Sequence, residues 1–408
     1  MNPEKVLIAL KLSSVLIILQ IFSLTSNTQT APTLKNSPIS NIPASTAIYG
    51  MDKSVWAVEA VMMFEGHCPY DPVGLALDSK GNPHFSFMNP DLEALFYVYS
   101  NGTERVITTV EDNDYTTGRQ NSIALDSQDR PMISYIDMSN EVLKFASLEG
   151  DQWIIESVGE NGQGFAYTHL SLDAQDRPMV GYMGGGQDVR MASHDGNSWT
   201  IQVADPVFTY LGLGYAVDSD EKPHFSYLVN YKDLQLASLT DSGWITETVD
   251  IGPGNYFDQM GAYSSLVYDS YNHPHLSYAQ FGQTFGGDWA EGLRYATYQN
   301  GAWYTTTVAD ESDEEGYYSS IQVNSEYNPA ISYFDKDNQA VRFVFWDGNR
   351  WVNQKVFSPV FIEDYTSLAL DENDVPHIAF CSDKSVYYAK RLDYRVYIPW
   401  FTKLEGAN

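Results

Sequence analysis

The stretch LDSQDRPMISY at residues 125–135 recurs as LDAQDRPMVGY at residues 172–182. Seven copies of this unit share one proline, and alignment on that proline gives steps of 45 to 55 residues. The aligned prolines are Pro83, Pro131, Pro178, Pro223, Pro274, Pro329 and Pro376. A period of this length is typical of solenoids, propellers and repeat arrays. The repeat therefore restricts the chain to a small set of folds.

Each copy contains four short runs of β-type residues separated by turn signals, which favours a propeller of four-stranded blades. In the second copy these runs are SIALD, PMISY, VLKFA and WIIESV, here termed strands A to D. The Asp or Asn that ends strand A is expected to accept hydrogen bonds from the backbone of the following turn. The repeat proline opens strand B, where it removes no ladder donor. An aromatic content of 14% also favours strands.

The seventh copy has strands A to C but lacks the Trp-bearing fourth strand. An unused run of the same kind, WAVEAV at residues 56–61, stands before the first copy. We therefore predict that this segment completes the seventh blade and closes the ring, which removes open sheet edges. The predicted fold class is all-β: a seven-bladed β-propeller of four-stranded antiparallel blades, closed by an N-terminal strand. Arg105 stands in the first copy where the other fourth strands begin with Trp.

The N-terminal segment has the pattern of a secretory signal, with Lys5 and Lys11, an apolar run at 12–24 and then small polar residues. The apolar run of 13 residues is shorter than the roughly 20 that a membrane helix needs. An uncleaved anchor beginning at Val6 is the alternative. We expect the protein to be secreted or held at the cell surface. The expected parts are a signal peptide (1–27), a disordered linker (28–50), the propeller (51–394) and a C-terminal tail (395–408).

The chain has two cysteines, Cys68 and Cys381, and both map to the blade that closes the ring. In an exported chain this favours a disulfide, and two separately buried thiols are the alternative. In the chain-entropy account, a bridge over 313 residues stabilises the fold by up to about 5 kcal/mol.

The formal net charge is −30, so the chain repels phosphate backbones and anionic membrane surfaces. We therefore expect no nucleic-acid partner and no membrane span after the signal. We expect a monomer without a cofactor. Calcium is the alternative, because the acidic stretch 310–315 could ligate it, although its spacing matches no ordered calcium loop.

The repeats resemble the SLALDSxGxPHISYYD…LKYA…W…ETV units of secreted bacterial β-propellers, over residues 55–392. The resemblance implies the propeller fold and export, and it implies no single activity. The segment YRVYIPWFTK similarly resembles the VYLPL-type ends of bacterial exported proteins. A more distant likeness to sialidase-like propellers is carried by SHDGNSW at 193–199, one residue short of the Asp-box SxDxGxxW. The arginine triad and early RIP motif of sialidases are missing, so sialidase activity is not expected.

Several histidines and arginines recur at fixed repeat positions and are interpreted as scaffold residues. These are His84, His224, His275, His377, Arg130, Arg177, Arg294 and Arg342. His169 differs, because it replaces the usual Ser of strand A beside the axis; it is either a packed or water-bonded residue or a catalytic one. The sequence contains no HExxH, CxxC, GxSxG or phosphate-binding loop, so no metal site or catalytic residue is predicted.

The loops that join strand D to the next strand A, and strand B to strand C, form one face of a propeller, and loops on a rigid scaffold carry binding residues. Four tyrosines share one position at the start of strand A and are predicted to surround the channel mouth on this face: Tyr167, Tyr263, Tyr318 and Tyr365. Further candidates in these loops are Asp137, Asp335, Asp383, Asp258 and Trp289. Aromatic faces beside carboxylates suit sugars or peptides. The alternative is that the tyrosines only cap the core.

These residues favour a non-enzymatic propeller that binds a glycan or an extracellular protein through the D–A/B–C face. The alternative is a carbohydrate-active enzyme, a glycoside hydrolase or polysaccharide lyase, with two carboxylates of that face as acid and base. It requires two carboxyl groups roughly 5–10 Å apart in one cleft. At least one should have a pKa raised by burial.

Overall fold

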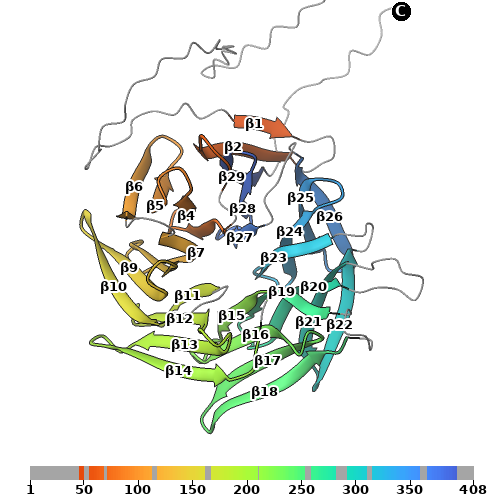
Figure 1. Cartoon of the computed structure of the whole chain (residues 1–408). Helices are drawn as coiled ribbons and strands as arrows, with labels where there is room; N and C mark the ends of the chain where they lie inside the picture. Colours follow the sequence, from red (N-terminus) through yellow and green to blue (C-terminus); the bar gives the residue numbers. More distant parts are fainter. Residues whose placement is uncertain are drawn as a thin grey trace, which may run out of the picture. The chain divides into compact units, whose positions relative to one another are not determined.

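The regular structure of the described chain is entirely β-strand, and the strands form seven antiparallel sheets. In this computed structural model the described residues are 46–49, 55–68, 71–112, 117–160, 167–209, 211–252, 259–281, 292–309, 315–358 and 365–392. Figure 1 shows the sheets arranged as blades around one axis, with the first strand of each blade innermost. Over these residues no helix is long and apolar enough to cross a membrane. The prediction of a seven-bladed propeller is confirmed.

Each blade is built in chain order from the axis outward. The A strands are β3 (Gly74–Leu77), β7 (Thr117–Leu125), β11 (Thr168–Leu172), β15 (Leu213–Val217), β19 (Gln259–Tyr268), β23 (Glu315–Val323) and β27 (Thr366–Leu370). The B strands are β4 (Pro83–Asn89), β8 (Pro131–Asp137), β12 (Pro178–Met183), β16 (Pro223–Val229), β20 (Pro274–Phe281), β24 (Pro329–Asp335) and β28 (Pro376–Ser382).

The outer half of each blade follows the same order. The C strands are β5 (Ala94–Ser100), β9 (Val142–Glu149), β13 (Val189–His194), β17 (Asp233–Thr240), β21 (Gly292–Gln299), β25 (Ala340–Trp346) and β29 (Ser385–Leu392). The D strands are β6 (Arg105–Asp112), β10 (Gln152–Glu160), β14 (Trp199–Asp205), β18 (Gly243–Asp250), β22 (Ala302–Ala309), β26 (Trp351–Phe357) and β2 (Val55–Met63).

The core lies between neighbouring blades. Ile133 and Tyr135 of β8 pack in one cluster with Leu95 and Tyr97 of β5, and all four are buried. Both faces of the inner strands are covered in this way, which explains why these strands carry few charges. The packing turns seven separate sheets into one unit.

The A–B turns confirm the role expected for the residue that ends strand A. Asp126 Oδ1 accepts hydrogen bonds from the backbone of Gln128 (2.9 Å) and Arg130 (2.8 Å). Asp129, at the fourth turn position, has a left-handed backbone with φ of 62°, which Asp and Asn adopt more readily than most residues. The side chain of Asp126 thus fixes the turn that leads into β8.

The ring closes as predicted. β2 pairs antiparallel with β29, with Trp56 opposite Arg391. The Trp56 side chain is fully buried, and its ring lies 5.5 Å from that of Phe343 in the sixth blade. Arg105 replaces the expected Trp in the first blade because its guanidinium donates to the carbonyls of Ala60 (3.2 Å) and Val61 (3.1 Å) on β2.

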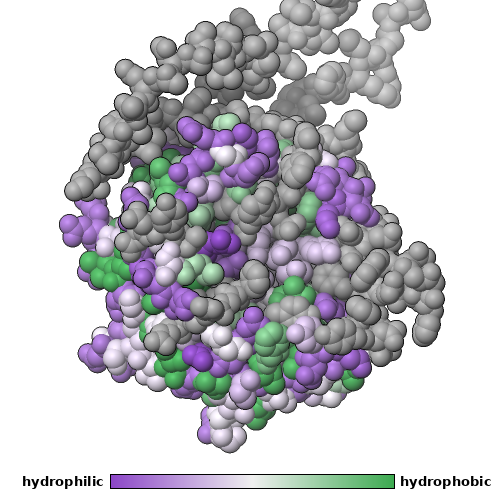
Figure 2. All heavy atoms as spheres, viewed as in Figure 1, coloured by the Kyte–Doolittle hydropathy of each residue, from purple (hydrophilic) through white to green (hydrophobic). Residues whose placement is uncertain are grey.

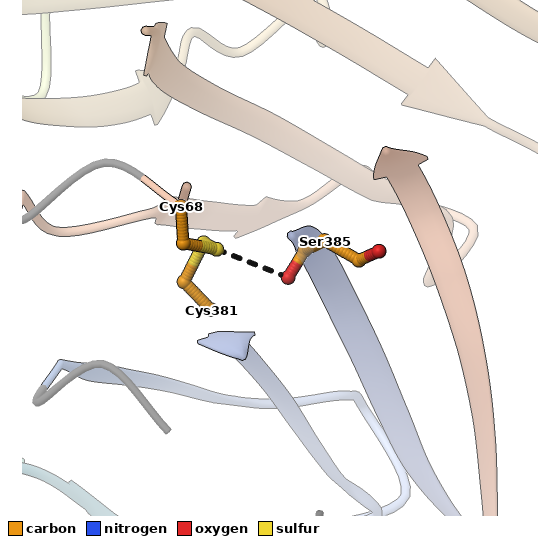
Figure 3. Close-up of a disulfide and its surroundings, with 3 residues drawn as sticks. All are labelled: Cys68, Cys381 and Ser385. Atoms are coloured by element: carbon orange, nitrogen blue, oxygen red, sulfur yellow. Dashed lines mark hydrogen bonds between the residues drawn. A yellow bond between two sulfur atoms is a disulfide. The ribbon is translucent and has the colours of Figure 1, made fainter. Parts of the chain in front are cut away.

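A disulfide joins Cys68 to Cys381, which confirms the predicted pairing (Figure 3). It links the segment after β2 to β28 of the same blade, and Cys68 Sγ also lies 3.2 Å from the carbonyl oxygen of Ser385. A strand at Thr46–Tyr49, β1, pairs with β2 as a fifth strand of this sheet. It lies within residues 28–50, which we expected to be linker, so the ordered part of the sheet begins earlier than the sequence indicated.

Candidate functional site

The four predicted tyrosines come together at the axis, where the A strands begin. The rings of Tyr263 and Tyr318 have centroids 4.0 Å apart, and those of Tyr318 and Tyr365 are also 4.0 Å apart. The hydroxyl of Tyr365 forms hydrogen bonds with the side chains of Tyr318, Tyr167 and Gln120. We call these four side chains the tyrosine cluster. They converge on the axis itself rather than standing apart around an opening.

A β-bulge that recurs in several A strands turns the side chains of Tyr263 and Tyr318 toward the axis. The register of β19 against β20 shifts between Ala262 and Ser265, and Tyr263 within the shift has a φ of 52°. Tyr318 (φ of 44°) and Gln120 (φ of 50°) occupy the same position in β23 and β7. A left-handed backbone costs a non-glycine residue about 1–2 kcal/mol. Bulges commonly redirect a side chain beside a functional site.

A glycine two residues earlier makes each bulge sterically possible. Gly316 has a φ of +93°, and a Cβ on it would lie 2.8 Å from the Cα of Leu293. Gly118 and Gly261 hold the equivalent positions, with φ of +93° and +108°. The pattern Gly-x-Tyr or Gly-x-Gln is thus the sequence signal for a residue turned toward the axis.

The tyrosine cluster is uncharged at neutral pH. Burial raises the pKa of Tyr365 to about 12, against the opposing effect of the hydrogen bonds it receives. Burial is also the main cause of the raised pKa values of Tyr167 and Tyr318, with further contributions from the neighbouring tyrosines. The cluster therefore offers neutral hydroxyl groups and ring surface.

A cavity of about 260 Å³ lies on the axis and is lined by the tyrosine cluster and by residues of the seven A strands. Its wall contains many hydroxyl groups, including those of Ser122, Ser265, Ser320 and Ser367. These serines also tie the blades together: Ser367 Oγ donates to the carbonyl of Val73 at 2.6 Å. Figure 2 shows hydrophilic residues near the centre of the face turned toward the viewer.

His169 lines the same cavity, as its position in the repeat predicted. Burial lowers its pKa to about 4, and a hydrogen bond to the backbone of Leu213 opposes that shift. His169 is therefore a neutral imidazole at physiological pH. It adds a polar but uncharged group to the wall.

An acid that the sequence did not single out lies at the edge of the mouth. Asp71 is buried and forms an ion pair with Arg119 (2.7 Å) and a hydrogen bond with the side-chain amide of Gln120 (3.0 Å). Burial raises the pKa of Asp71 despite these partners. Asp71 and Arg119 occupy the same repeat position in neighbouring blades. Their opposite charges at that shared position could have indicated an ion pair from the sequence alone.

The predicted loop acids do not join this site. Asp137 is fully buried, and its carboxylate lies 2.8 Å from Lys144 Nζ and accepts from the Asn140 backbone at 3.0 Å. Asp335 is held in the same way by Arg342 Nε, at 2.5 Å. These carboxylates hold B–C loops in place. Burial alone would raise the pKa of Asp137, but the hydrogen bonds from Lys144 and Asn140 outweigh it and lower the pKa.

The remaining candidates are placed elsewhere or lie outside the described residues. Asp383 is exposed in the turn between β28 and β29, where its carbonyl accepts from the Cys68 backbone at 3.0 Å. Asp258 and Trp289 lie outside the described residues, as does most of the acidic stretch 310–315. In the described part of the chain, no group of three or more His, Cys, Asp or Glu residues could hold a metal ion.

The structure thus defines a closed seven-bladed propeller with an uncharged axial cavity beneath a cluster of tyrosines. No protein-family model matches the chain, and no curated protein matches it significantly. Among solved structures, an ulvan lyase from a new family of polysaccharide lyases aligns with a TM-score of 0.57 at 12% identity. The alignment covers 80% of this chain and 94% of the lyase.

Two further structures show the same likeness. An ulvan lyase bound to -[GlcA(1-4)Rha3S]- aligns with a TM-score of 0.55 at 12% identity, over 80% of this chain and 94% of its own. An oligogalacturonate lyase from Vibrio parahaemolyticus aligns with a TM-score of 0.54 at 11% identity, over 86% and 97%. At these identities, what the proteins share is the propeller fold.

Proposed function

We propose that this protein is an exported propeller that binds a carbohydrate at the mouth of its axial cavity, on the D–A/B–C face. The observation that carries the proposal is the convergence of Tyr263, Tyr318 and Tyr365, with Tyr167, over a wall of neutral hydroxyl groups. Aromatic surface beside a few oriented polar groups is the usual composition of a small-ligand site. Sugars present both apolar faces and hydroxyl groups, so they match both parts.

The fold comparisons agree with this class of ligand. The aligned lyases are named for ulvan and for oligogalacturonate, and one of them holds the bound sugar sequence -[GlcA(1-4)Rha3S]-. They support a carbohydrate ligand for this chain. An extracellular protein that presents a glycan is included in the proposal.

Export is part of the proposal. It is supported by the signal-type pattern of residues 1–27 and by the disulfide between Cys68 and Cys381, since disulfides persist in oxidising compartments. Mass spectrometry of the protein recovered outside the cytoplasm of its host should show an N-terminus near residue 28. Recovery of an intact residue 1 in the membrane fraction would replace cleavage with anchoring.

A glycan array probed with the purified protein tests the binding proposal. Tyr365→Ala removes the hydroxyl that joins the cluster to Gln120 and should abolish or strongly reduce binding. Tyr304→Ala is the matched control, because Tyr304 is 60% exposed on β22, far along its blade from the axis. Silence of the wild-type protein on arrays and on purified polysaccharides contradicts the proposal.

One observation favours the second candidate, a polysaccharide lyase or glycoside hydrolase. Asp71 combines burial, a raised pKa and a position beside Arg119 at the mouth, and strongly perturbed acids in clefts are often functional. Release of reducing ends or unsaturated products from polysaccharides tests it. Loss of that release in Asp71→Asn, with retained folding, would assign the acid a catalytic part.

A further inference from the structure

Two A–B turns, in the fifth and sixth blades, carry a tyrosine where the other turns carry a small or hydrophilic residue. The third turn position is Tyr271 in the fifth blade and Lys, Gln, Asp, Glu or Asn in the others. The fourth position is Tyr327 in the sixth blade and Gly, Asp, Glu or Asn in the others. These turns join β19 to β20 and β23 to β24, in neighbouring blades (Figure 1). Two departures from the repeat therefore meet at one blade interface.

The two rings lie against each other on the surface. Their centroids are 4.8 Å apart, and the ring planes make an angle of 59°. Tyr271 is 66% exposed and Tyr327 is 40% exposed. Their hydroxyl groups are hydrogen-bonded to each other, and Ser270 Oγ donates to the Tyr327 hydroxyl at 3.3 Å. The ring of His273 lies 6.1 Å from that of Tyr271. We call Tyr271, Tyr327 and His273 the aromatic row.

Tyr327 weakens the contact between its two blades. Its φ is 63°, a left-handed backbone that Gly and Asn adopt more readily. At the preceding interface, Asn272 Oδ1 accepts from the backbone N–H (2.9 Å) and the hydroxyl (2.7 Å) of Ser219. Tyr327 has no carboxylate or amide oxygen to act as this acceptor, and its hydroxyl accepts the longer bond from Ser270 instead. A residue that lowers stability and leaves its ring in solvent is typical of a binding site.

The turns around the aromatic row are acidic. The A–B turns of the fourth to seventh blades contain eight carboxylates and one lysine, Lys222. The carboxylates are Asp218, Asp220, Glu221, Asp269, Glu326, Asp371, Glu372 and Asp374. Asp269 Oδ2 lies 3.0 Å from His273 Nδ1 of the row. Lys390 of β29 offsets one of the others, at 3.7 Å from Asp371. Negative charge is therefore concentrated on both sides of the rings.

The ring geometry and the charge favour the same ligand chemistry. A sugar ring stacks flat on one aromatic plane, and two faces inclined at 59° cannot both lie flat against it. A cation is attracted to the face of each ring within about 6 Å of its centroid, whatever the angle between the rings. The guanidinium group of arginine also stacks on aromatic faces and pairs with carboxylates through its planar fork. The neighbouring acids repel an anionic ligand and attract a cationic one.

We propose that the aromatic row is a docking site for a basic segment of a partner protein, with an arginine seated over Tyr271 and Tyr327. The carboxylates of the neighbouring turns pair with further basic residues of that segment, so the two surfaces are complementary in charge. Tyrosine and arginine are both enriched among the residues that dominate binding at protein interfaces. The site lies at the end of the propeller opposite the tyrosine cluster, and it goes beyond the carbohydrate binding proposed for the mouth.

A fluorescent hexa-arginine peptide, titrated at low ionic strength and followed by anisotropy, tests the site. The acidic surface alone also attracts this peptide, so the variants leave the net charge unchanged. Tyr271→Gln and Tyr327→Asn restore ordinary repeat residues, and Tyr304→Gln removes an exposed tyrosine from β22 as the control. We expect about ten-fold weaker binding in the double variant, the effect of two exposed cation–π contacts. Tyr304→Gln should bind as wild type.

Thermal unfolding separates a binding role from a structural one. Tyr327→Asn relieves the left-handed tyrosine and restores an acceptor for Ser270, so it should raise the thermal midpoint. A lower midpoint would assign the ring a structural role and overturn the inference. Absence of hexa-arginine binding by wild type, or equal affinity in the double variant, also overturns it.

The glycan array separates this site from the proposed function. The double variant should bind the array as wild type does, because the two sites lie at opposite ends of the propeller. Loss of array binding in the double variant would replace the basic partner with a sugar. A silent array, together with hexa-arginine binding that depends on the two tyrosines, removes the carbohydrate proposal and retains this site.

Discussion

The two ends of the propeller are made from the same repeats, but turn length and key turn residues are constant at one end and vary at the other. At the A–B end every turn has five residues between strand A and the proline of strand B, and an Asp or Asn begins each turn. At the D–A/B–C end the loops differ in length and sequence, and the side chains near the axis change from blade to blade. The constant end acts as a frame, and this leaves the other end free to vary.

The frame is held by hydrogen bonds that pass from blade to blade in one direction. Ser127 donates to Asp176 of the next blade through its backbone N–H (2.9 Å) and its hydroxyl (2.6 Å). Ser325 donates to Asp374 in the same way. Between the seventh and first blades, Glu372 and Gly81 occupy these two positions, so the side-chain acceptor is missing there. This seam is instead closed by β2, by Arg105 and by the disulfide.

Acidification is expected to give the largest loss in the free energy of unfolding, because it protonates histidines beneath the A–B turns. His84 and His377 lie beneath A–B turns, and burial lowers the pKa of each to about 4. The unfolded chain binds these protons below about pH 6.5 and the folded chain does not, so stability is full above that pH and falls toward pH 4. The shift corresponds to about 3 kcal/mol for each histidine. Urea unfolding at about pH 7 and about pH 4.5 measures the loss.

The facing carboxylates do not reverse this expectation. Burial alone would raise the pKa values of Asp78 and Asp371, but hydrogen bonds outweigh it and lower them. Their contribution is lost only below about pH 4. Hydrogen exchange near pH 5 should show the A–B turns opening before the axial ends of the A strands. Equal stability at both pH values would contradict a frame built on neutral histidines.

Removal of the disulfide should give the next largest loss, because it acts at the seam that lacks the turn-to-turn hydrogen bonds. In the chain-entropy account, a closed loop of this length contributes up to about 5 kcal/mol. The double variant Cys68→Ser and Cys381→Ser should unfold at lower denaturant. A reducing agent should lower the midpoint of wild type and leave that of the variant unchanged. Equal midpoints for the two proteins would show that β2 and Arg105 close the ring alone.

A pair of aspartates compares the two ends directly. Asp126 is 5% exposed and accepts from two backbone N–H groups and from Arg130 Nε at 2.6 Å. Asp126→Ala should cost about 2–3 kcal/mol, because it leaves buried donors unpaired. Asp383 is exposed at the opposite end and has a left-handed backbone (φ of 53°), which Asn also adopts, so Asp383→Asn should change stability by less than about 0.5 kcal/mol. Equal losses, read by denaturant unfolding, would contradict the division between frame and variable end.

The sequence predicted what depends on local pattern. The period, the spare strand at 56–61 and the Asp of each A–B turn are repeated letters with local physical roles, and each is confirmed. The shared repeat position of the tyrosines predicted a ring of side chains around the channel mouth, whereas Tyr263 and Tyr318 lie in contact on the axis itself. These features can be predicted because the same residue type recurs wherever the same local structure recurs.

What the sequence could not predict depends on contacts between blades. The bulge at Tyr263 requires the approach of Gly261 to Leu234 in another blade, and the ring of Tyr215 requires Gly181. Asp137 is an ordinary loop acid in the sequence, and only the fold shows that Lys144 holds it. Departures from a repeat are therefore informative about function only when their neighbours across the blade interface are known.

The smallest effect concerns a single turn-to-turn hydrogen bond. Ser127→Ala removes the hydroxyl that donates to Asp176 and keeps the backbone N–H bond, so it should cost about 0.5–1 kcal/mol. The third blade already contains this change: Ala174 donates only through its backbone, to Glu221 at 2.9 Å. Ser127→Ala should therefore resemble a natural interface of the ring. A small drop in thermal midpoint, with unchanged glycan binding, would show that the frame tolerates the loss of one such bond. A loss above about 2 kcal/mol would mean that these bonds act cooperatively around the ring.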